Sequence, residues 1–194
     1  AGVLLPFCLK GAGAAEALIL DLGAQGANAG AAAGDVLFGI EEVWGTALGD
    51  RMTGDALANV FRGEGGSDWL SGGLGNDALY GGDGDDTLMG GAGSDRLEGG
   101  LGRDLVSYGD ATSGLRADFA VPTLNTGDAR GDVYAWVEDI EGSSFADTLG
   151  GDGGGGGSLG GGGADVGLGR GGNDALQGGE GDDTYVFDTD TALG

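Results

Sequence analysis

Five aspartates recur at nine-residue intervals between residues 63 and 107, and they are the strongest chemical signal in the chain. They stand sixth in the consecutive units GEGGSDWLS, GGLGNDALY, GGDGDDTLM, GGAGSDRLE and GGLGRDLVS. Glycine at places one, two and four permits left-handed and tight-turn backbone, so we expect the first six residues of each unit to form a turn and the last three a short strand. Each turn would then offer a carboxylate and unpaired backbone carbonyls. Such hard oxygen ligands suit calcium.

The eighth place of each unit is apolar, which indicates how the strands pack. The residues there are Leu70, Leu79, Leu88, Leu97 and Val106. One inward apolar side chain per unit is the pattern of a coil that stacks a narrow core, whereas a flexible glycine-rich linker keeps no such position. The spacing therefore predicts a coil in which short strands stack around a narrow core.

These units match the consensus GGxGxDxUx, so the chain resembles the RTX family of hemolysin-type calcium-binding repeats. The resemblance implies an all-β fold, a parallel β-roll or β-solenoid, in which each calcium ion lies between one turn and the turn two units on. It pairs Asp68 with Asp86, Asp77 with Asp95, and Asp86 with Asp104, and it adds carbonyls of turn glycines. The ligand set that it implies over the whole chain is Asp68, Gly73, Gly75, Asp77, Gly82, Gly84, Asp86, Gly91, Gly93, Asp95, Gly100, Gly102, Asp104, Asp165, Gly172, Asp174, Gly179, Gly181 and Asp183.

A second, longer period overlies the first. Residues 36–55 align without gaps with residues 133–152, and GGLGNDALYGGDGDDTL recurs as GRGGNDALQGGEGDDTY at the same offset of 97. We therefore expect two stacked copies of one unit in a continuous body. The first copy is residues 1–97, with coil repeats at 54–97. The second is residues 98–194, in which repeats 99–107 continue the first coil and 151–186 form its own.

The second copy is the weaker calcium binder by sequence. Its stretch Gly153 to Gly157 has no side chains, and Gly167 stands where an apolar residue is expected. Asp165, Asp174 and Asp183 are its remaining candidate ligands, and only the first and last are two units apart. We expect one full site there.

Composition and charge exclude several classes of protein. Fifty glycines with only two prolines and no third-residue period exclude a collagen helix. The formal charge of −24 argues against binding to nucleic acid or to anionic membranes, and bound divalent cations would relieve the repulsion. No segment is apolar enough for a membrane span. Cys8 is the only cysteine, so the chain forms no internal disulfide.

Catalytic motifs are missing from the sequence. The chain contains no histidine, which excludes an HExxH zinc site and a Ser-His-Asp triad within these residues. Adjacent carboxylates such as Asp85 and Asp86 are better explained as a solvated turn residue beside a ligand than as an acid/base pair. We therefore predict a chain that is not an enzyme.

Three function classes remain. The first is a non-catalytic, calcium-binding extracellular module with a structural or adhesive role, which folds on calcium after secretion and contacts other copies or a larger assembly. The second is the secretion and folding tail of a hydrolase or toxin, and the third is an accessory subunit of a larger extracellular assembly. The family resemblance implies secretion through a type I channel, guided by a signal near the C-terminus. The opening AGVLLPFCLK is interpreted as a strand or a cap. The duplication favours the first class, because arrays of modules build length.

Overall fold

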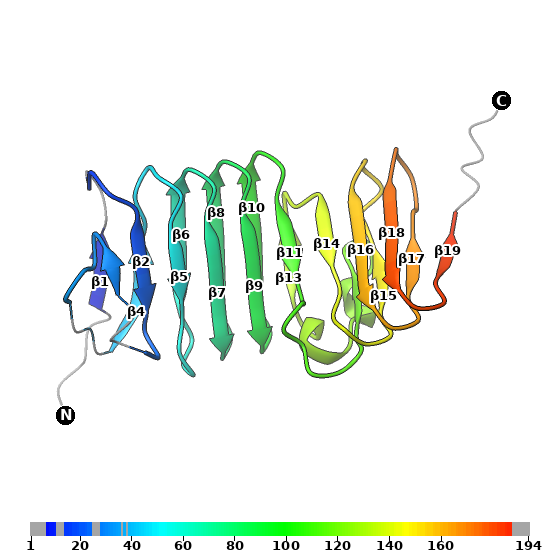
Figure 1. The fold of residues 1–194 in the computed structure, drawn as a ribbon, viewed down its shortest axis with the longest axis horizontal. Coiled ribbons are helices and arrows are strands. Elements are labelled where there is room, and N and C mark those ends of the chain that lie inside the picture. Colours follow the sequence, from blue (N-terminus) through cyan, green and yellow to red (C-terminus); the bar gives the residue numbers. More distant parts are fainter. Residues whose placement is uncertain (1–6, 11–13, 25–27, 36, 38, 188–194) are drawn as a thin grey trace.

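The computed structural model shows an elongated, almost entirely β protein (Figure 1). It describes residues 7–10, 14–24, 28–35, 37 and 39–187. Residues 1–6 of the opening segment and residues 188–194 lie outside the described residues. The first part contains β1 (Phe7–Lys10), β2 (Leu18–Asp21), β3 (Ala29–Gly30), β4 (Ile40–Trp44), β5 (Arg51–Thr53), β6 (Val60–Gly65), β7 (Trp69–Leu74), β8 (Ala78–Asp83), β9 (Thr87–Ala92) and β10 (Arg96–Leu101). The second contains β11 (Leu105–Ser107), β12 (Arg116–Asp118), η2 (Pro122–Leu124), η3 (Gly127–Ala129), β13 (Val133–Ala135), β14 (Asp139–Glu141), β15 (Thr148–Gly150), β16 (Gly157–Gly162), β17 (Val166–Leu168), β18 (Ala175–Glu180) and β19 (Thr184–Val186).

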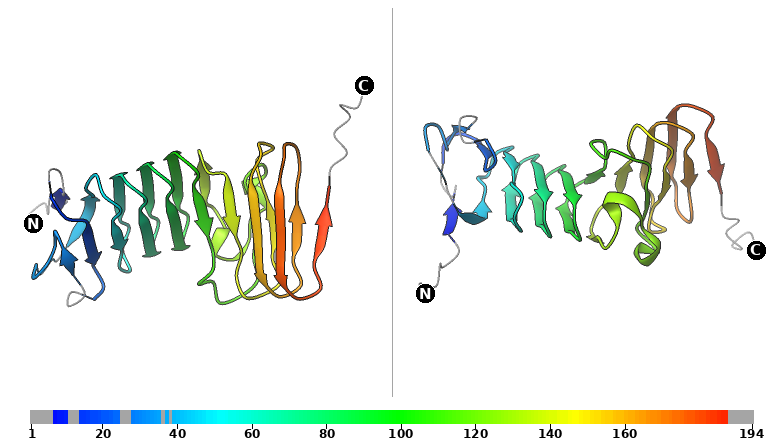
Figure 2. Two further views of the ribbon diagram at one scale, coloured as in Figure 1. Left: turned by 45° about the horizontal axis from the view of Figure 1, so that its top comes forward. Right: turned by 90° about the horizontal axis from the view of Figure 1, so that it is seen from below.

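Strands β5 to β10 pair with the strands 18 residues away, two units along the chain, and not with their neighbours in sequence. The described residues form sheets in the order β1-β4-β6-β8-β10-β13, β18-β16-β14-β11-β9-β7-β5-β2-β3 and β12-β15-β17-β19. In these sheets every strand pairing is parallel except that of β2 with the two-residue β3, and one isolated bridge, between Arg116 and Thr126, is antiparallel. Successive strands alternate between opposite walls, as the two turned views in Figure 2 show. The fold is the predicted parallel β-solenoid.

The strands are longer than the sequence predicted. Strand β8 spans places seven to nine of one unit and places one to three of the next, and it pairs along its length with β6 and β10. Only places four to six form the turn, so the expectation of a six-residue turn was wrong. The glycines at the first places belong to strands because their backbone groups bond to the next coil on the same wall.

The core of the coil consists of the eighth-place side chains, one from each unit, which come alternately from the two walls. Met52, Phe61, Leu70, Leu79, Leu88, Leu97 and Val106 are all fully buried. Each contributes about 2 kcal/mol through removal of its apolar surface from water. The predicted apolar positions are therefore confirmed as the core of the coil.

The strand pairings of the first half recur in the second half with an offset of 97 residues. Pairing of Leu9 with Val43 becomes Val106 with Ile140, and pairing of Val60 with Ala78 becomes Gly157 with Ala175. Strands that correspond in the two halves lie on opposite walls. Strands β4, β6 and β8 of the first half lie in one sheet, whereas β14, β16 and β18 of the second half lie in the sheet of β9. None of the helical turns in the described part of the chain is long or apolar enough to cross a membrane.

Candidate metal centre

The sixth-place aspartates form two stacks, one on each side of the solenoid. The amide of each sixth-place residue donates a hydrogen bond to Oδ1 of the aspartate two units on. The first stack has Asp50 to Asp68 at 2.7 Å, Asp68 to Asp86 at 2.8 Å and Asp86 to Asp104 at 2.9 Å. The second has Asn59 to Asp77 at 2.7 Å and Asp77 to Asp95 at 2.8 Å. The neighbours expected from the sequence, Asp68 with Asp86, Asp77 with Asp95 and Asp86 with Asp104, are therefore adjacent.

The second oxygen of each of these carboxylates is buried without a partner. Among the described residues, an orphaned Oδ2 atom occurs at Asp68, Asp77, Asp86, Asp95, Asp104 and Asp165. Each of these residues is at most 3 % exposed. An ionised oxygen removed from water without a hydrogen bond or counter-charge is strongly disfavoured, so a cation at this position would stabilise the fold.

Burial also perturbs the acidity of these groups. Loss of hydration raises the pKa of Asp68 to about 7 and those of Asp77 and Asp86 to about 6, with a further increase from the aspartate next in the stack. Loss of hydration likewise raises the pKa values of Asp95 and Asp104. The bond from the preceding sixth-place amide opposes these increases. The stacks therefore hold several carboxylates whose negative charge the protein itself does not balance.

The first-place glycines are needed for close approach, not for left-handed backbone. A Cβ on Gly81 would overlap Oδ2 of Asp86 and would lie 2.8 Å from its Cγ. The first-place glycines do not have positive φ, so the expectation that they need unusual dihedrals was wrong. They leave room for the carboxylate of their own unit.

Most second- and fourth-place glycines of residues 63–107 have the predicted positive φ, and Gly93 is the exception. Gly82 and Gly84 have φ of 120° and 134°, and their carbonyl oxygens face the Cα atoms of Gly100 and Gly102 in the turn two units on. The carbonyls of Gly73 and Gly75 face Gly91 and Gly93 in the same way. The spaces between these stacked turns are thus bordered by carbonyl oxygens, and the sixth-place aspartate of the same units, Asp77 or Asp86, carries an orphaned Oδ2.

The structure adds stack members that the nonapeptide register does not contain. Oδ1 of Asp132 accepts the amide of Asp95 at 2.9 Å, and Oε2 of Glu138 accepts that of Asp104 at 3.0 Å. Asp132 differs from the aspartates before it because its Oδ2 accepts the Tyr108 hydroxyl at 2.8 Å. The sequence signal was weak, since the chain between 108 and 131 makes an excursion through η2 and η3 before it rejoins the coil.

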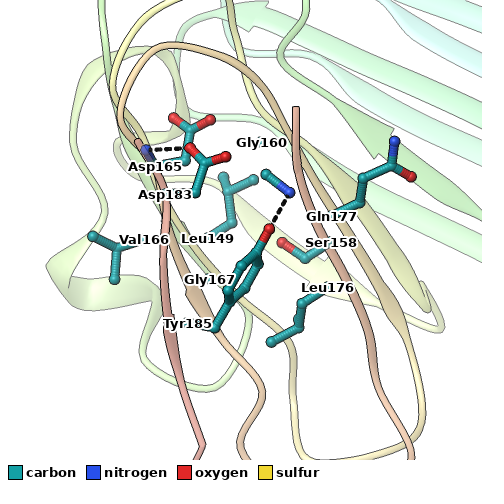
Figure 3. Close-up of a pocket in the computed structure, with 11 residues that line it drawn as sticks. Leu149, Ser158, Gly160, Asp165, Val166, Gly167, Leu176, Gln177, Asp183 and Tyr185 are labelled. Atoms are coloured by element: carbon teal, nitrogen blue, oxygen red, sulfur yellow. Dashed lines mark hydrogen bonds between the residues drawn. The ribbon is translucent and has the colours of Figure 1, made fainter. Parts of the chain in front are cut away.

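The last coil repeats the arrangement with fewer members. The amide of Asp165 donates to Oδ1 of Asp183 at 3.1 Å, and the two side chains lie together in Figure 3. Oδ1 of Asp174 accepts the backbone amide of Gly156 at 3.2 Å, but Gly156 brings no carboxylate of its own to the stack. Tyr185 turns inward over Gly167 and accepts the amide of Gly178 at 2.7 Å. Its ring fills part of the space that Gly167 leaves empty.

The remaining predicted carbonyl donors lie at the end of this coil. Gly172, Gly179 and Gly181 all have positive φ. The carbonyl oxygen of the glycine 18 residues earlier lies against each of them. In the described part of the chain no three acidic, histidine or cysteine side chains converge as a metal cluster, so a cation between the turns would depend largely on backbone oxygens. Calcium accepts such oxygen-rich, flexible coordination.

Comparison with known proteins agrees with this chemistry. The model of the RTX calcium-binding nonapeptide repeat matches residues 44–79, 80–111 and 159–191, which together are more than half of the chain and contain all six orphaned carboxylates. A search of curated proteins gives no significant match. The chain belongs to the family of RTX calcium-binding nonapeptide-repeat proteins, and its repeats bind Ca²⁺.

Proposed function

We propose that calcium ions bind between stacked turns through the sixth-place aspartates and the second- and fourth-place glycine carbonyls named above. The observation that supports this assignment is the set of six buried Oδ2 atoms without partners. Bound calcium would supply the positive charge that these oxygens lack. The residues of the chain do the rest: the glycines bring carbonyl oxygens into the space between turns, and the stacked amides hold Oδ1 so that Oδ2 faces that space.

The proposed role is that of a non-catalytic extracellular module whose folding is coupled to calcium. Extracellular calcium modules typically have dissociation constants of about 10⁻⁴ to 10⁻³ M, so the repeats would load outside the cell and stay empty in the cytosol. The formal charge of −24 acts in the same direction, since it opposes compaction until cations bind. Secretion before folding follows from these two conditions.

A structural or adhesive role is the form of this function that the architecture favours. The same pairing register occurs twice at an offset of 97 residues, and we propose 1–97 and 98–194 as the two units. Repetition of a whole module lengthens the body and multiplies its surface, whereas a secretion tail needs only a coil that folds. Sequencing the coding region on both sides would separate the two roles. Further 97-residue copies support the structural role, whereas an upstream HExxH or GxSxG motif would support a hydrolase tail.

The ligand assignment is tested with a matched pair of variants in one unit. Asp86→Asn removes a buried stack carboxylate, and Asp83→Asn removes an exposed acid three residues earlier. Calorimetric titration should show weaker calcium binding for Asp86→Asn and nearly unchanged binding for Asp83→Asn. Equal effects would mean that calcium responds to net charge and not to the stacks.

A further inference from the structure

The turns at the start of each copy differ from the others in how they satisfy the sixth-place carboxylate. In the first copy, the amide of Thr46 donates to Oδ2 of Asp50 at 2.6 Å and its hydroxyl donates to Oδ1 at 2.9 Å. In the second copy, the amide of Ser143 donates to Oδ2 of Asp147 at 2.6 Å, and its hydroxyl lies 3.1 Å from Oδ1 and 2.9 Å from Oδ2. Neither Asp50 nor Asp147 has an orphaned oxygen, although both are buried.

The space between turns has the same shape at these positions. A Cβ on Gly45 would overlap Oδ2 of Asp50 and lie 2.5 Å from the carbonyl oxygen of Gly63, and Gly142 is related to Asp147 and Gly160 in the same way. Gly81 has this relation to Asp86 and to the carbonyl of Gly99, where Oδ2 is orphaned. The difference therefore lies in what faces the carboxylate, not in the outline of the turn.

The second residue of the nine-residue unit accounts for the difference; it is Thr46 in the unit 45–53 and Ser143 in the unit 142–150. In the units with orphaned aspartates this residue has positive φ: it is Gly73, Gly82, Gly91, Gly100 or Gly161, and in one unit Glu64 with φ of 75°. At Thr46 and Ser143 the φ angle is not positive, and the amide points at the carboxylate. Asp55 follows the same rule, because its φ is not positive and its amide donates to Oδ1 of Asn59 at 3.1 Å.

The side chains of Thr46 and Ser143 stabilise the backbone conformation without positive φ. The hydroxyl of Thr46 also accepts the amide of Leu48 at 3.0 Å, and that of Ser143 accepts the amide of Phe145 at 3.1 Å. Such local bonds from a hydroxyl to the backbone two residues on stabilise a turn without left-handed dihedrals.

We propose that the second-place residue decides whether a turn takes calcium. Glycine with positive φ directs its amide away and leaves Oδ2 for an ion, whereas Thr46 and Ser143 supply the amide and hydroxyl that replace the ion. Asp50 and Asp147 are consequently not calcium ligands, despite standing at the sixth place. With Asn59 and Gly156, which carry no carboxylate, they give each copy a first coil whose turns are complete without metal. This inference rests on the ligand assignment proposed above.

The test counts the ions bound at saturating calcium, by native mass spectrometry of the full chain, in variants of two successive turns on one side. Asp50→Asn should bind as many ions as the unaltered protein, because an asparagine oxygen still accepts the Thr46 amide, as Asn59 does with Asp55. Asp68→Asn should lose at least one ion. Thr46→Gly should gain one, because it frees Oδ2 of Asp50.

A second pair of variants serves as the alternative if the first does not fold. If Asp50→Asn does not fold, Asp147→Asn against Asp165→Asn gives the same contrast in the second copy. Equal loss of ions from Asp50→Asn and Asp68→Asn, with no gain in Thr46→Gly, would overturn this inference while leaving calcium binding between the other turns intact. Failure of the unaltered chain to retain calcium would instead overturn the ligand assignment itself.

Discussion

Removal of calcium at neutral pH should unfold the coil, and acid should partly reverse the effect. In the calcium-free fold, burial raises the pKa of Asp68 from 3.8 to about 7 and those of Asp77 and Asp86 to about 6. One pKa unit corresponds to about 1.4 kcal/mol, so keeping these groups charged costs about 4 kcal/mol at Asp68 and about 3 kcal/mol at each of the others. Together this is comparable with the whole free energy of unfolding of a typical domain, about 5–15 kcal/mol.

The sign of the pH dependence follows from the direction of these shifts. A carboxyl whose pKa is higher in the folded than in the unfolded chain binds its proton more tightly when folded. Stability of the calcium-free fold therefore falls as pH rises from about 4 to about 7, the interval between the unfolded and folded pKa values. With calcium bound, the same carboxylates are balanced by the ions, and the dependence should be reversed because protons compete with the metal.

Circular dichroism with a chelator, at about pH 5 and about pH 7.5, measures this effect. The calcium-free chain should show more β-structure at the lower pH, and calcium should restore it at the higher one. Asp86→Asn should weaken the pH dependence because it removes one of the buried titrating groups. Asp83→Asn removes an exposed charge that is the smallest contributor to the raised pKa of Asp86, so it should change the pH dependence much less. A β-rich spectrum that is the same with and without calcium and at both pH values would refute the argument that these carboxylates are buried without a counter-charge.

Three further outcomes are expected. Asp86→Ala should reduce calcium affinity more than Asp174→Ala, because Asp86 lies between two stack neighbours whereas Asp174 meets only a glycine; equal losses in calorimetric titration would contradict ion sharing between turns. With calcium saturating, peptide-resolved hydrogen exchange should be slower in residues 63–107 than in 151–168, since Gly153 to Gly157 contribute no packing and ordering glycine costs about 0.5–1 kcal/mol more than ordering alanine; the opposite order would show that the coil register is misassigned. Leu79→Ala should lower the free energy of unfolding in calcium by about 2–5 kcal/mol, because it leaves a cavity in a single-file core, and a change under 1 kcal/mol in denaturant titration would show that the coil collapses around it.

The periodic part of the fold could be predicted from the sequence because its determinants are local. Glycine at fixed places permits the turn, and one apolar side chain per unit can be buried only if the units stack, so the nine-residue period implies a stacked coil. The parallel direction of the strands and the pairing of Asp68 with Asp86 were implied by the family resemblance that the same period carries. The family match and the structure confirm these expectations.

The role of the individual turns depended on contacts that no period encodes. Asp132 joins the stack of Asp95 only because the chain leaves the coil after Ser107 and returns beside β10, and its second oxygen then meets the Tyr108 hydroxyl. From the sequence, the first-place glycines were expected to allow the backbone dihedrals of the turn. In the structure they instead leave room for the carboxylate of their own unit.

Asp50 and Asp86 illustrate the boundary between the two sources of information. Both are buried and stand sixth in a nine-residue unit, and the structure places both in the same stack. Which of them has an Oδ2 atom without a hydrogen-bond partner is decided by the direction of one backbone amide, at Thr46 or at Gly82. That direction depends on a single φ angle. The sequence by itself determined the coil and the positions of its carboxylates, and only the tertiary structure decided which of those carboxylates is left without a counter-charge, because satisfaction of a buried oxygen depends on the three-dimensional orientation of its neighbours.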